Sequence, residues 1–312
     1  MIRRGTRLAV TAVALFAGAM GGCASSSVHE TAKAPARAPV IVKGDTGAAA
    51  SWDEVISSTS GSEVVIIGEN HGHPLGLATA SKIWTDTLAR ADKATLSMEF
   101  LERDEQSHID DYLAGLVDEK TFKSSTGRTE GNYPPGHREM VETAKAAKRP
   151  VIASNAPRPQ VRAASKEGYD KLRTLTPEQQ RLVRIPDAIP TSRYYDDFVK
   201  VMSDPAAAHG PPPKTEEERQ QAIERAFRSQ SLWDWTMADS VVKATSAGGT
   251  PVCHVVGRFH CDFQGGLVQA VQKLRPGTRV VVVSFVDDWS DTLREEDRGR
   301  GDYVIYVGPA PQ

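Results

Sequence analysis

Short runs of β-branched residues alternate with longer amphipathic stretches along most of this chain, and this alternation restricts its fold more than any other feature. Runs of this kind, bounded by glycine, proline or polar residues, are typical of buried strands. They occupy residues 63–67, 94–98, 149–153, 251–256 and 279–285, and a last one at 303–307 is expected at the sheet edge. Strands that alternate with helices at this spacing form βαβ units. The sequence therefore predicts an α/β fold with a mostly parallel sheet flanked by helices.

The segment between the third and fourth runs departs from this alternation. Residues 160–230 are polar, rich in helix formers and interrupted by several prolines. Residues 203–214 contain four of these prolines and are expected to form a loop. A helix is then expected from Thr215 to about Thr245, because three glutamates open it and acids in a first turn are favoured by the helix dipole. We therefore expect a helical subdomain, inserted at about 160–230, that covers the active edge of the sheet as a lid.

The first 22 residues resemble a lipoprotein signal peptide. Three arginines precede an apolar stretch at 8–19, which is too short to span a membrane as a helix. Met20-Gly21-Gly22-Cys23 resembles a bacterial lipobox, in which the chain is cut before the cysteine and the cysteine is acylated. Lipid chains on Cys23, palmitate among them, would then anchor the protein to a membrane. The alternative is an ordinary signal peptide in which Cys23 occurs by chance.

The stretch after Cys23 is expected to be a tether. Residues 24–50 are mostly Ala, Ser, Pro, Gly and Lys, and such a composition buries too little apolar surface to offset the cost of ordering the chain. The folded domain is accordingly expected at 51–312. Ala24, directly after the cysteine, resembles the sorting pattern for the outer membrane of diderm bacteria. The sequence thus predicts an exported protein held at a bacterial membrane by its lipid.

Charge and cysteines exclude two classes of site. The net charge is −2, whereas a nucleic-acid partner would require a strongly basic face. Apart from Cys23, the cysteines are Cys253 and Cys261. An extended chain places these two farther apart than the ~7 Å that a disulfide tolerates, so two free thiols are expected. Their spacing also does not match that of a cysteine-based zinc site.

Acid and histidine side chains directly follow three of the predicted strands. Glu69 and His71 follow the first strand, Glu99 follows the second and His260 follows the strand at 251–256. Because the carboxyl ends of parallel strands line one crevice, these four residues are expected to converge. Two imidazoles and two carboxylates are suited to binding a divalent metal or to acid–base catalysis. The alternative is structural: an acid that caps a helix and a histidine that bonds to the backbone.

Further residues are predicted to contact a ligand near this crevice. They are His73, Asn155, Arg158, Asp234 and Arg258. Asn155 and Arg158 follow the third strand, and arginine suits a carboxylate or a phosphate. Asp234, in the late helix, is expected to close the site from above together with Trp233. Arg258 is expected to pair with Glu99 and to lower the pKa of that acid.

Two histidines also have ordinary structural interpretations. His73 follows the first motif, and the sequence favours a solvated loop residue there over a ligand-binding one. His254 lies inside a predicted strand and is expected to be a core residue with its hydrogen bonds satisfied.

Five motifs occur in a recognisable order. They are Gly68-Glu69-Asn70-His71, Met98-Glu99-Phe100, Asn155-Ala156-Pro157-Arg158, the stretch 229–238, and Gly257-Arg258-Phe259-His260. This set resembles the ChaN-like family of bacterial lipoproteins, within the broader group that contains Tiki, TraB and erythromycin esterase proteins. The resemblance implies an α/β fold with a helical subdomain, haem bound at the surface, and a role in iron or haem uptake. It also leaves open a homodimer that shares haem between its subunits.

The resemblance has two further implications for the site. In the broader group, the residues that match Glu69, His71, Glu99 and His260 are linked to metal-dependent hydrolysis. The haem ligand of the family falls in none of the five motifs, and Tyr194 and Tyr195 are candidates because tyrosine and histidine ligate haem iron. The sequence therefore favours a haem-binding lipoprotein, with a metal-dependent hydrolase and a binding protein with a relic site as the alternatives.

Overall fold

The structure is a computed structural model that describes residues 37–189, 192–203 and 215–311. The signal peptide, Cys23, the first part of the tether and nearly all of the loop expected at 203–214 lie outside these ranges. No helix within them has the length and apolar character that crossing a membrane requires.

A seven-stranded sheet forms the centre of the fold, with the strand order β1-β7-β6-β2-β5-β3-β4. The strands are β1 (Val40–Lys43), β2 (Val64–Glu69), β3 (Thr95–Glu102), β4 (Val151–Asn155), β5 (Val252–Gly257), β6 (Val280–Val286) and β7 (Tyr303–Tyr306). All neighbouring strands pair in parallel except β1, which runs antiparallel to β7. The predicted α/β class with a mostly parallel sheet is confirmed.

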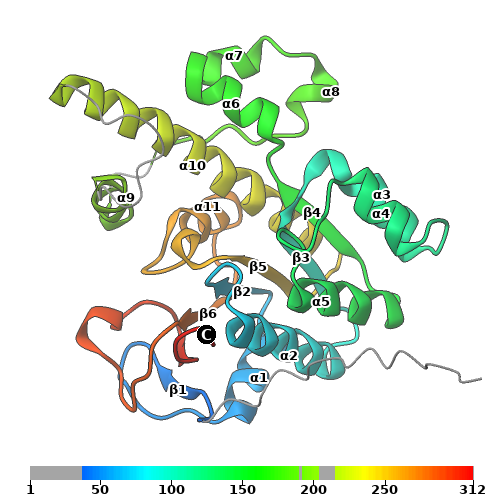
Figure 1. The fold of residues 1–312 in the computed structure, drawn as a ribbon, viewed down its shortest axis with the longest axis vertical. Coiled ribbons are helices and arrows are strands. Elements are labelled where there is room, and N and C mark those ends of the chain that lie inside the picture. The colour runs from blue at the N-terminus through cyan, green and yellow to red at the C-terminus, as the bar shows by residue number, and fades with distance from the viewer. Residues whose placement is uncertain (1–36, 190–191, 204–214, 312) are drawn as a thin grey trace, which may run out of the picture. The chain divides into compact units, whose positions relative to one another are not determined.

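Helices cover both faces of this sheet (Figure 1). The helices before β4 are α1 (Trp52–Ser60), α2 (Pro74–Arg90), α3 (Gln106–Leu113), α4 (Glu119–Ser125) and α5 (Pro135–Ala146). Those after it are α6 (Arg158–Glu167), α7 (Tyr169–Arg173), α8 (Pro177–Gln180), α9 (Arg193–Ser203), α10 (Glu216–Ser246) and α11 (Gly266–Leu274). The first group packs on one face, and α10 and α11 pack on the other.

The central strand β2 shows why the sheet is covered on both sides. Val65 and Ile67 point into the core shared with α1, α2 and α5, whereas Val64 and Ile66 point into the core shared with α10 and α11. Every residue of β2 is buried. A strand buried on both faces reads as a continuous apolar run rather than as an alternating one, which is the pattern in this sequence.

The N-terminal boundary of the fold differs from the prediction. The tether was expected to reach residue 50, but β1 pairs with β7 over four residues, and Val42 is buried. Consequently β7 is an interior strand of the sheet and not the predicted edge strand. The β1 segment has only three apolar residues and a lysine, and it lies in a stretch rich in proline and glycine. This is too short a pattern to distinguish an edge strand from a linker.

This boundary leads to a first prediction. A chain that begins at residue 51 should melt at a lower temperature than one that begins at residue 37, because it lacks β1 and exposes the edge of β7. The loss of the buried Val42 side chain alone corresponds to roughly 1.5–3 kcal/mol of burial. Thermal unfolding of the two chains measures the difference, and equal melting temperatures would show that β1 adds no stability.

As predicted, the helical insertion lies between β4 and β5. However, it has no boundary near residue 230, where the sequence suggested its end. Residue 230 falls inside α10, which continues unbroken to Ser246. Leu232 of α10 packs in the core of the insertion, and Val241 of the same helix packs against the sheet. This helix starts where the sequence predicts, and Thr215 caps it by accepting a hydrogen bond of 3.1 Å from the Glu218 amide. One helix therefore serves both the insertion and the sheet.

Two local features complete the first half of the fold. Helix α4 is capped by Asp118 and fixed by the buried Phe122. The side chain of Leu116 is 75% exposed, because α3 ends at Leu113. Cys253 and Cys261 are free thiols, as predicted.

Candidate functional site

The predicted convergence of strand ends is present in the structure. β2, β5 and β3 are neighbours in the sheet, so the residues at and just after their carboxyl ends meet. Glu69 ends β2, Glu99 lies near the end of β3, and His260 lies in a 3-10 turn, η3 (Arg258–His260), that follows β5. They border a crevice of about 390 Å³, a volume typical of small-molecule sites. It is lined by Glu69, His71, Glu99, Phe100, Glu102, His137, Asn155, Arg158, Trp233, Val255 and His260.

The buried carboxylate of Glu69 lies between two imidazoles. One oxygen is 3.1 Å from Nδ1 of His71, and the other is 2.8 Å from Nε2 of His137. Burial opposes ionisation of Glu69, but the hydrogen bonds to His137 and His71 outweigh it and lower the pKa of the acid. The bond to Glu69 in turn raises the pKa of His71, whose side chain is 69% exposed. His71 is thus held by one nitrogen and open to the crevice.

His137 is a site residue that the sequence did not reveal. It lies on α5, stacks on Phe100 with ring centroids 4.7 Å apart, and is buried. Its Nδ1 has no hydrogen-bond partner within the described part of the chain. His137 follows no predicted strand and lies in none of the five motifs. Only its place on a helix that packs beside β3 could have suggested that it reaches the crevice.

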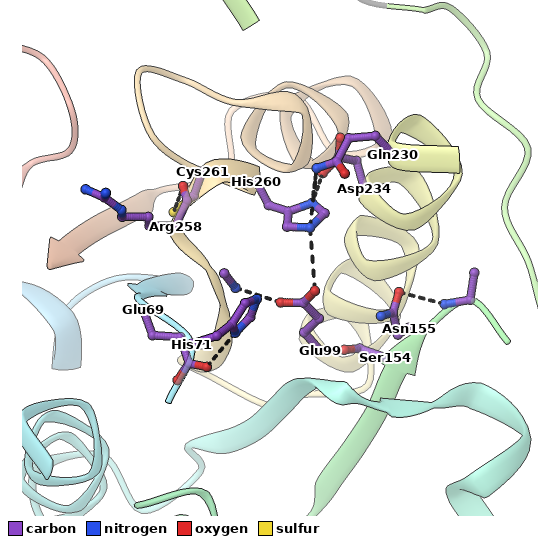
Figure 2. Close-up of polar contacts among 12 residues, drawn as sticks. Glu69, His71, Glu99, Ser154, Asn155, Gln230, Asp234, Arg258, His260 and Cys261 are labelled. Carbon is purple, nitrogen blue, oxygen red and sulfur yellow. Dashed lines mark hydrogen bonds and ion pairs between the residues drawn. The ribbon is translucent and has the colours of Figure 1, made fainter. Parts of the chain in front are cut away.

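His260 lies between two acids on the opposite wall of the crevice. Its Nδ1 is 2.6 Å from Oδ1 of Asp234, and its Nε2 is 3.5 Å from Oε1 of Glu99 (Figure 2). Burial alone would lower the pKa of His260, but the two carboxylates raise it to about 10. Burial likewise opposes ionisation of Glu99, yet His260, His71 and the amide of Gly257 lower the pKa of that acid to about 2. His260 is therefore an imidazolium at neutral pH.

Asp234 of α10 connects this wall to the insertion. Its second oxygen accepts a hydrogen bond of 2.8 Å from the Tyr194 hydroxyl of α9, which itself accepts one of 2.9 Å from Gln230. Burial raises the pKa of Asp234, with His260 and Tyr194 acting in the opposite direction. The close approach of α11 requires Gly266, because a Cβ there would overlap Oδ2 of Asp234. Asp234 thus lies beside His260, and its predicted contact with a ligand stays a prediction.

Tyr194 does not have the environment of a haem ligand. Its side chain is buried, and its hydroxyl is engaged by Asp234 and Gln230. Burial raises the pKa of this phenol well above its usual range, which opposes the phenolate that would ligate iron. Tyr195 is half-buried and packs edge-on against Phe227.

Gly257 at the end of β5 brings the two walls together. Its amide donates a hydrogen bond of 2.6 Å to Glu99, and a Cβ at this position would lie 2.6 Å from Nε2 of His71. The neighbouring β3 strand changes register against β4 between Met98 and Glu102, an irregularity of the kind that redirects side chains near functional sites. The missing side chain at Gly257 therefore keeps Nε2 of His71 uncovered.

We predict that Gly257→Ala displaces the His71 ring. His71 is exposed and can rotate, so the free energy of unfolding should change by less than about 1 kcal/mol. The pKa of His71 should fall, because the bond to Glu69 that raises it would be lost. Proton NMR titration of the histidines measures this, with Gly131→Ala as a control because no atom other than a threonine hydroxyl at 3.8 Å faces that position. An unchanged His71 pKa would contradict the prediction.

Two of the other predicted ligand contacts lie in the crevice and a third does not. Asn155 and Arg158 line the crevice as expected, and Arg158 also pairs with Glu102 at 3.2 Å. Arg258 does not pair with Glu99. Its guanidinium instead points away from the crevice towards Asp287, at 3.8 Å, because the 3-10 turn directs Arg258 and His260 to different sides (Figure 2).

His73 and His254, the other two histidines that the sequence singled out, are structural. His73 was expected to be solvated but is buried: its Nδ1 accepts a hydrogen bond from the Gly76 amide and its Nε2 donates one to the Gly308 carbonyl. It thus caps α2 and is not part of the crevice. His254 is a core residue, as predicted, with Nδ1 2.9 Å from the Ser97 hydroxyl, and burial lowers its pKa to about 3. The expectation that its hydrogen bonds are satisfied is wrong, because its buried Nε2 has no partner among the described residues.

The acids and histidines of the crevice were predicted to be able to bind a divalent metal. Within residues 37–189, 192–203 and 215–311, no group of three or more His, Cys, Asp or Glu side chains is arranged to hold a metal ion. A metal ligand needs a free lone pair, but both nitrogens of His260 face carboxylates. A metal-binding role for Glu69, His71, Glu99 and His260 thus stays a prediction.

The arrangement is suited to binding and to proton transfer. His71 can accept a proton at Nε2 while Glu69 orients its ring, and the imidazolium of His260 can stabilise negative charge on a bound group. Phe100 and Trp233 add aromatic surface, and Arg158 adds a cation.

Two comparisons relate this chain to known proteins. Residues 55–271 match the family described as "Haem-binding uptake, Tiki superfamily, ChaN". A solved structure titled "Cofacial heme binding to ChaN of Campylobacter jejuni" shares the fold with a TM-score of 0.65 at 16% identity, over 86% of this chain and 96% of that one.

Other similarities are weaker. The type III effector HopBA1 matches with a TM-score of 0.44 at 15% identity, over 83% of this chain and 93% of that one. An erythromycin esterase matches with 0.44 at 12%, over 78% and 76%. No curated protein matches the chain significantly. The family match covers well over half of the sequence, and the chain therefore belongs to the ChaN family of haem-binding uptake proteins in the Tiki superfamily.

Proposed function

We propose that this protein is an exported, lipid-anchored haem-binding protein that serves in haem or iron uptake. The observation that carries the proposal is the family match over residues 55–271, together with the fold shared with a protein whose title describes haem binding. Haem would be the cargo of the protein and not a catalyst.

The residues near the crevice are compatible with haem. Histidine is a common ligand of haem iron, and metal-ligating histidines usually donate their other nitrogen to a carboxylate. His71 has this arrangement, since Glu69 occupies Nδ1 and Gly257 leaves Nε2 uncovered. When bound, the haem would supply an iron with an open coordination position, and the chain would supply the imidazole and the aromatic surface around it.

A haemin titration tests the proposal directly. The chain from residue 37 onward, which contains all of the described fold, should shift the Soret band of haemin saturably, at about one haem per chain or per pair of chains. Size measurements with and without haemin would distinguish a monomer from a homodimer that shares the ligand. If the chain leaves the haemin spectrum unchanged, the haem-binding proposal fails.

The lipid anchor rests on the sequence around Cys23 and has its own test. Cys23→Ser should abolish labelling by a fatty-acid analogue and move the protein from the membrane fraction to the soluble fraction of a bacterial host. In a diderm host, the acylated protein should fractionate with the outer membrane. Equal membrane association of both forms would contradict lipid anchoring.

Hydrolysis is the second candidate, favoured by one observation. The crevice brings together a carboxylate-oriented, exposed His71 and the His260 imidazolium, which are the groups that water activation and charge stabilisation require. Turnover of simple esters or amides that disappears in His71→Ala, with and without added divalent metal, would support it. Activity that persists in this variant would count against it.

A further inference from the structure

The central sheet ends at β1 on one side and at β4 on the other. An edge strand presents a row of N–H and C=O groups through which a second chain can add itself to the sheet. At β1 the chain closes its own edge. The Lys43 amide donates to the Ala48 carbonyl at 2.8 Å, and the next bond runs from the Ala50 amide to the Ile41 carbonyl at 3.0 Å. The segment after β1 therefore folds back along its outer side.

At β4 a single side chain takes the position of a neighbouring strand. Gln106 of α3 donates from Nε2 to the Val151 carbonyl at 2.9 Å and accepts from the Ala153 amide at 2.7 Å. A residue of an adjacent parallel strand makes the same two bonds, to the carbonyl of one residue and to the amide two positions later. The other side of β4 faces β3, where the Leu96 amide donates to the Pro150 carbonyl. The bonds of Gln106 therefore lie on the outer side, where a further strand would bind.

Helix α3 holds the Gln106 amide in this orientation. The amide donates a second hydrogen bond, of 2.9 Å, to Asp110 one turn later. Both of its hydrogens are then used, and its oxygen faces the Ala153 amide, so the three partners together fix which atom is oxygen and which is nitrogen. Ile109 and Tyr112 bury α3 in the core. Gln106 is thus presented to β4 from a packed helix.

The strand itself carries none of the usual protections of an edge. Natural edge strands are commonly protected by a charged side chain or a proline. The β4 sequence, Val151–Asn155, contains neither, and its central residue Ile152 is only half-buried. Protection of this edge therefore depends on Gln106.

We propose that Gln106 closes the β4 edge against a second copy of this chain. Without the amide, two copies pair antiparallel through their β4 strands, which is the symmetric way for two identical edges to meet. The inference goes beyond the proposed function and does not depend on haem. A homodimer that shares a ligand would have to use a different surface.

The test removes the amide and follows self-association. The chain from residue 37 onward, which forms one compact unit, is studied by sedimentation equilibrium as the wild type, Gln106→Ala and Gln106→Met. The methionine keeps the length of the side chain in case the alanine variant fails to fold. The matched control is Gln272→Ala, which also removes a bond of 2.9 Å from a glutamine to a carbonyl, that of Thr278, but on α11.

The wild type and the control should remain monomeric at about 100 µM, whereas the Gln106 variants should associate at least about tenfold more tightly. A lysine in the middle of the open strand should reverse this, so Gln106→Ala combined with Ile152→Lys should be monomeric again. Hydrogen exchange adds a local measurement. In the dilute, monomeric Gln106→Ala chain, the Ala153 amide should exchange about fivefold faster than in the wild type, because it has lost its acceptor.

Three results would overturn the proposal. Gln106 variants that stay monomeric at the same concentration show that the edge does not pair, and the exchange of the Ala153 amide then shows whether the edge was opened at all. Equal association of Gln272→Ala shows that lost stability, and not the edge, is the cause. Dimers that persist with Ile152→Lys show that the copies meet at another surface.

Discussion

Asp234→Ala should destabilise the fold by roughly 3–5 kcal/mol, the range found when one partner of a buried ion pair is removed. His260 would lose the carboxylate 2.6 Å from its Nδ1, and the Tyr194 hydroxyl would lose its acceptor. Both groups are buried and would remain without these partners. Urea unfolding measures the loss. Asp234→Asn is the matched control, because it keeps the volume and an acceptor oxygen while removing the charge, and it should cost less.

The same pair predicts how stability depends on pH. The folded chain raises the pKa of His260 from 6.5 to about 10, so protonated His260 adds stability that is complete below about pH 6.5. This contribution should decline as the pH rises from there through about 10. In Asp234→Asn the decline should begin at the same pH, which the unfolded chain sets, and should end at a lower pH, because one of the two carboxylates that raise the pKa of folded His260 is absent. Unfolding curves that keep the same pH dependence in both proteins would contradict the ion pair.

Glu69→Ala should have the second-largest effect, at roughly 2–3 kcal/mol, because charge-assisted hydrogen bonds to two imidazoles would be lost at once. His137 would then have no partner at either nitrogen among the described residues. The pKa of His71 should also fall, since its bond to Glu69 is the main cause that raises it.

Glu69→Gln separates the two effects of this change. The amide keeps the shape of the side chain and can still hydrogen bond, so stability should be largely retained, whereas the pKa of His71 should fall as in Glu69→Ala. Histidine NMR titration and urea unfolding together give both quantities. Equal stability of Glu69→Ala and the wild type would show that the two histidines do not depend on this acid.

The strand pattern accounts for most of what could be predicted from the sequence. Glu69, Glu99 and His260 were brought together by one argument: buried parallel strands whose carboxyl ends share an edge. That argument needs only local patterns, an apolar run followed by a polar residue. It succeeded because β2, β5 and β3 are neighbours, so that the polar residues after them share one crevice.

The residues that escaped prediction depend on contacts between distant segments. His137 reaches Glu69 across 68 positions from a helix that carries no motif, and His73 is fixed by the carbonyl of Gly308, 235 positions away. β1 is too short to show a period and gains its order only from pairing with β7. Arg258 was assigned the wrong partner because the direction of a side chain in a 3-10 turn is not encoded in its spacing from His260.

The length of α10 has a mechanical consequence. Its 31 residues, about 46 Å at 1.5 Å per residue, contain neither glycine nor proline, so the helix has no weak point at which it would readily bend. Phe227, in the first half of the helix, packs against α9. Asp234, two turns later, forms the ion pair with His260. A movement of α9 would therefore be transmitted through this rigid helix to the ion pair of Asp234 and His260. The insertion and the crevice are thus joined by one continuous helix and not by a flexible hinge.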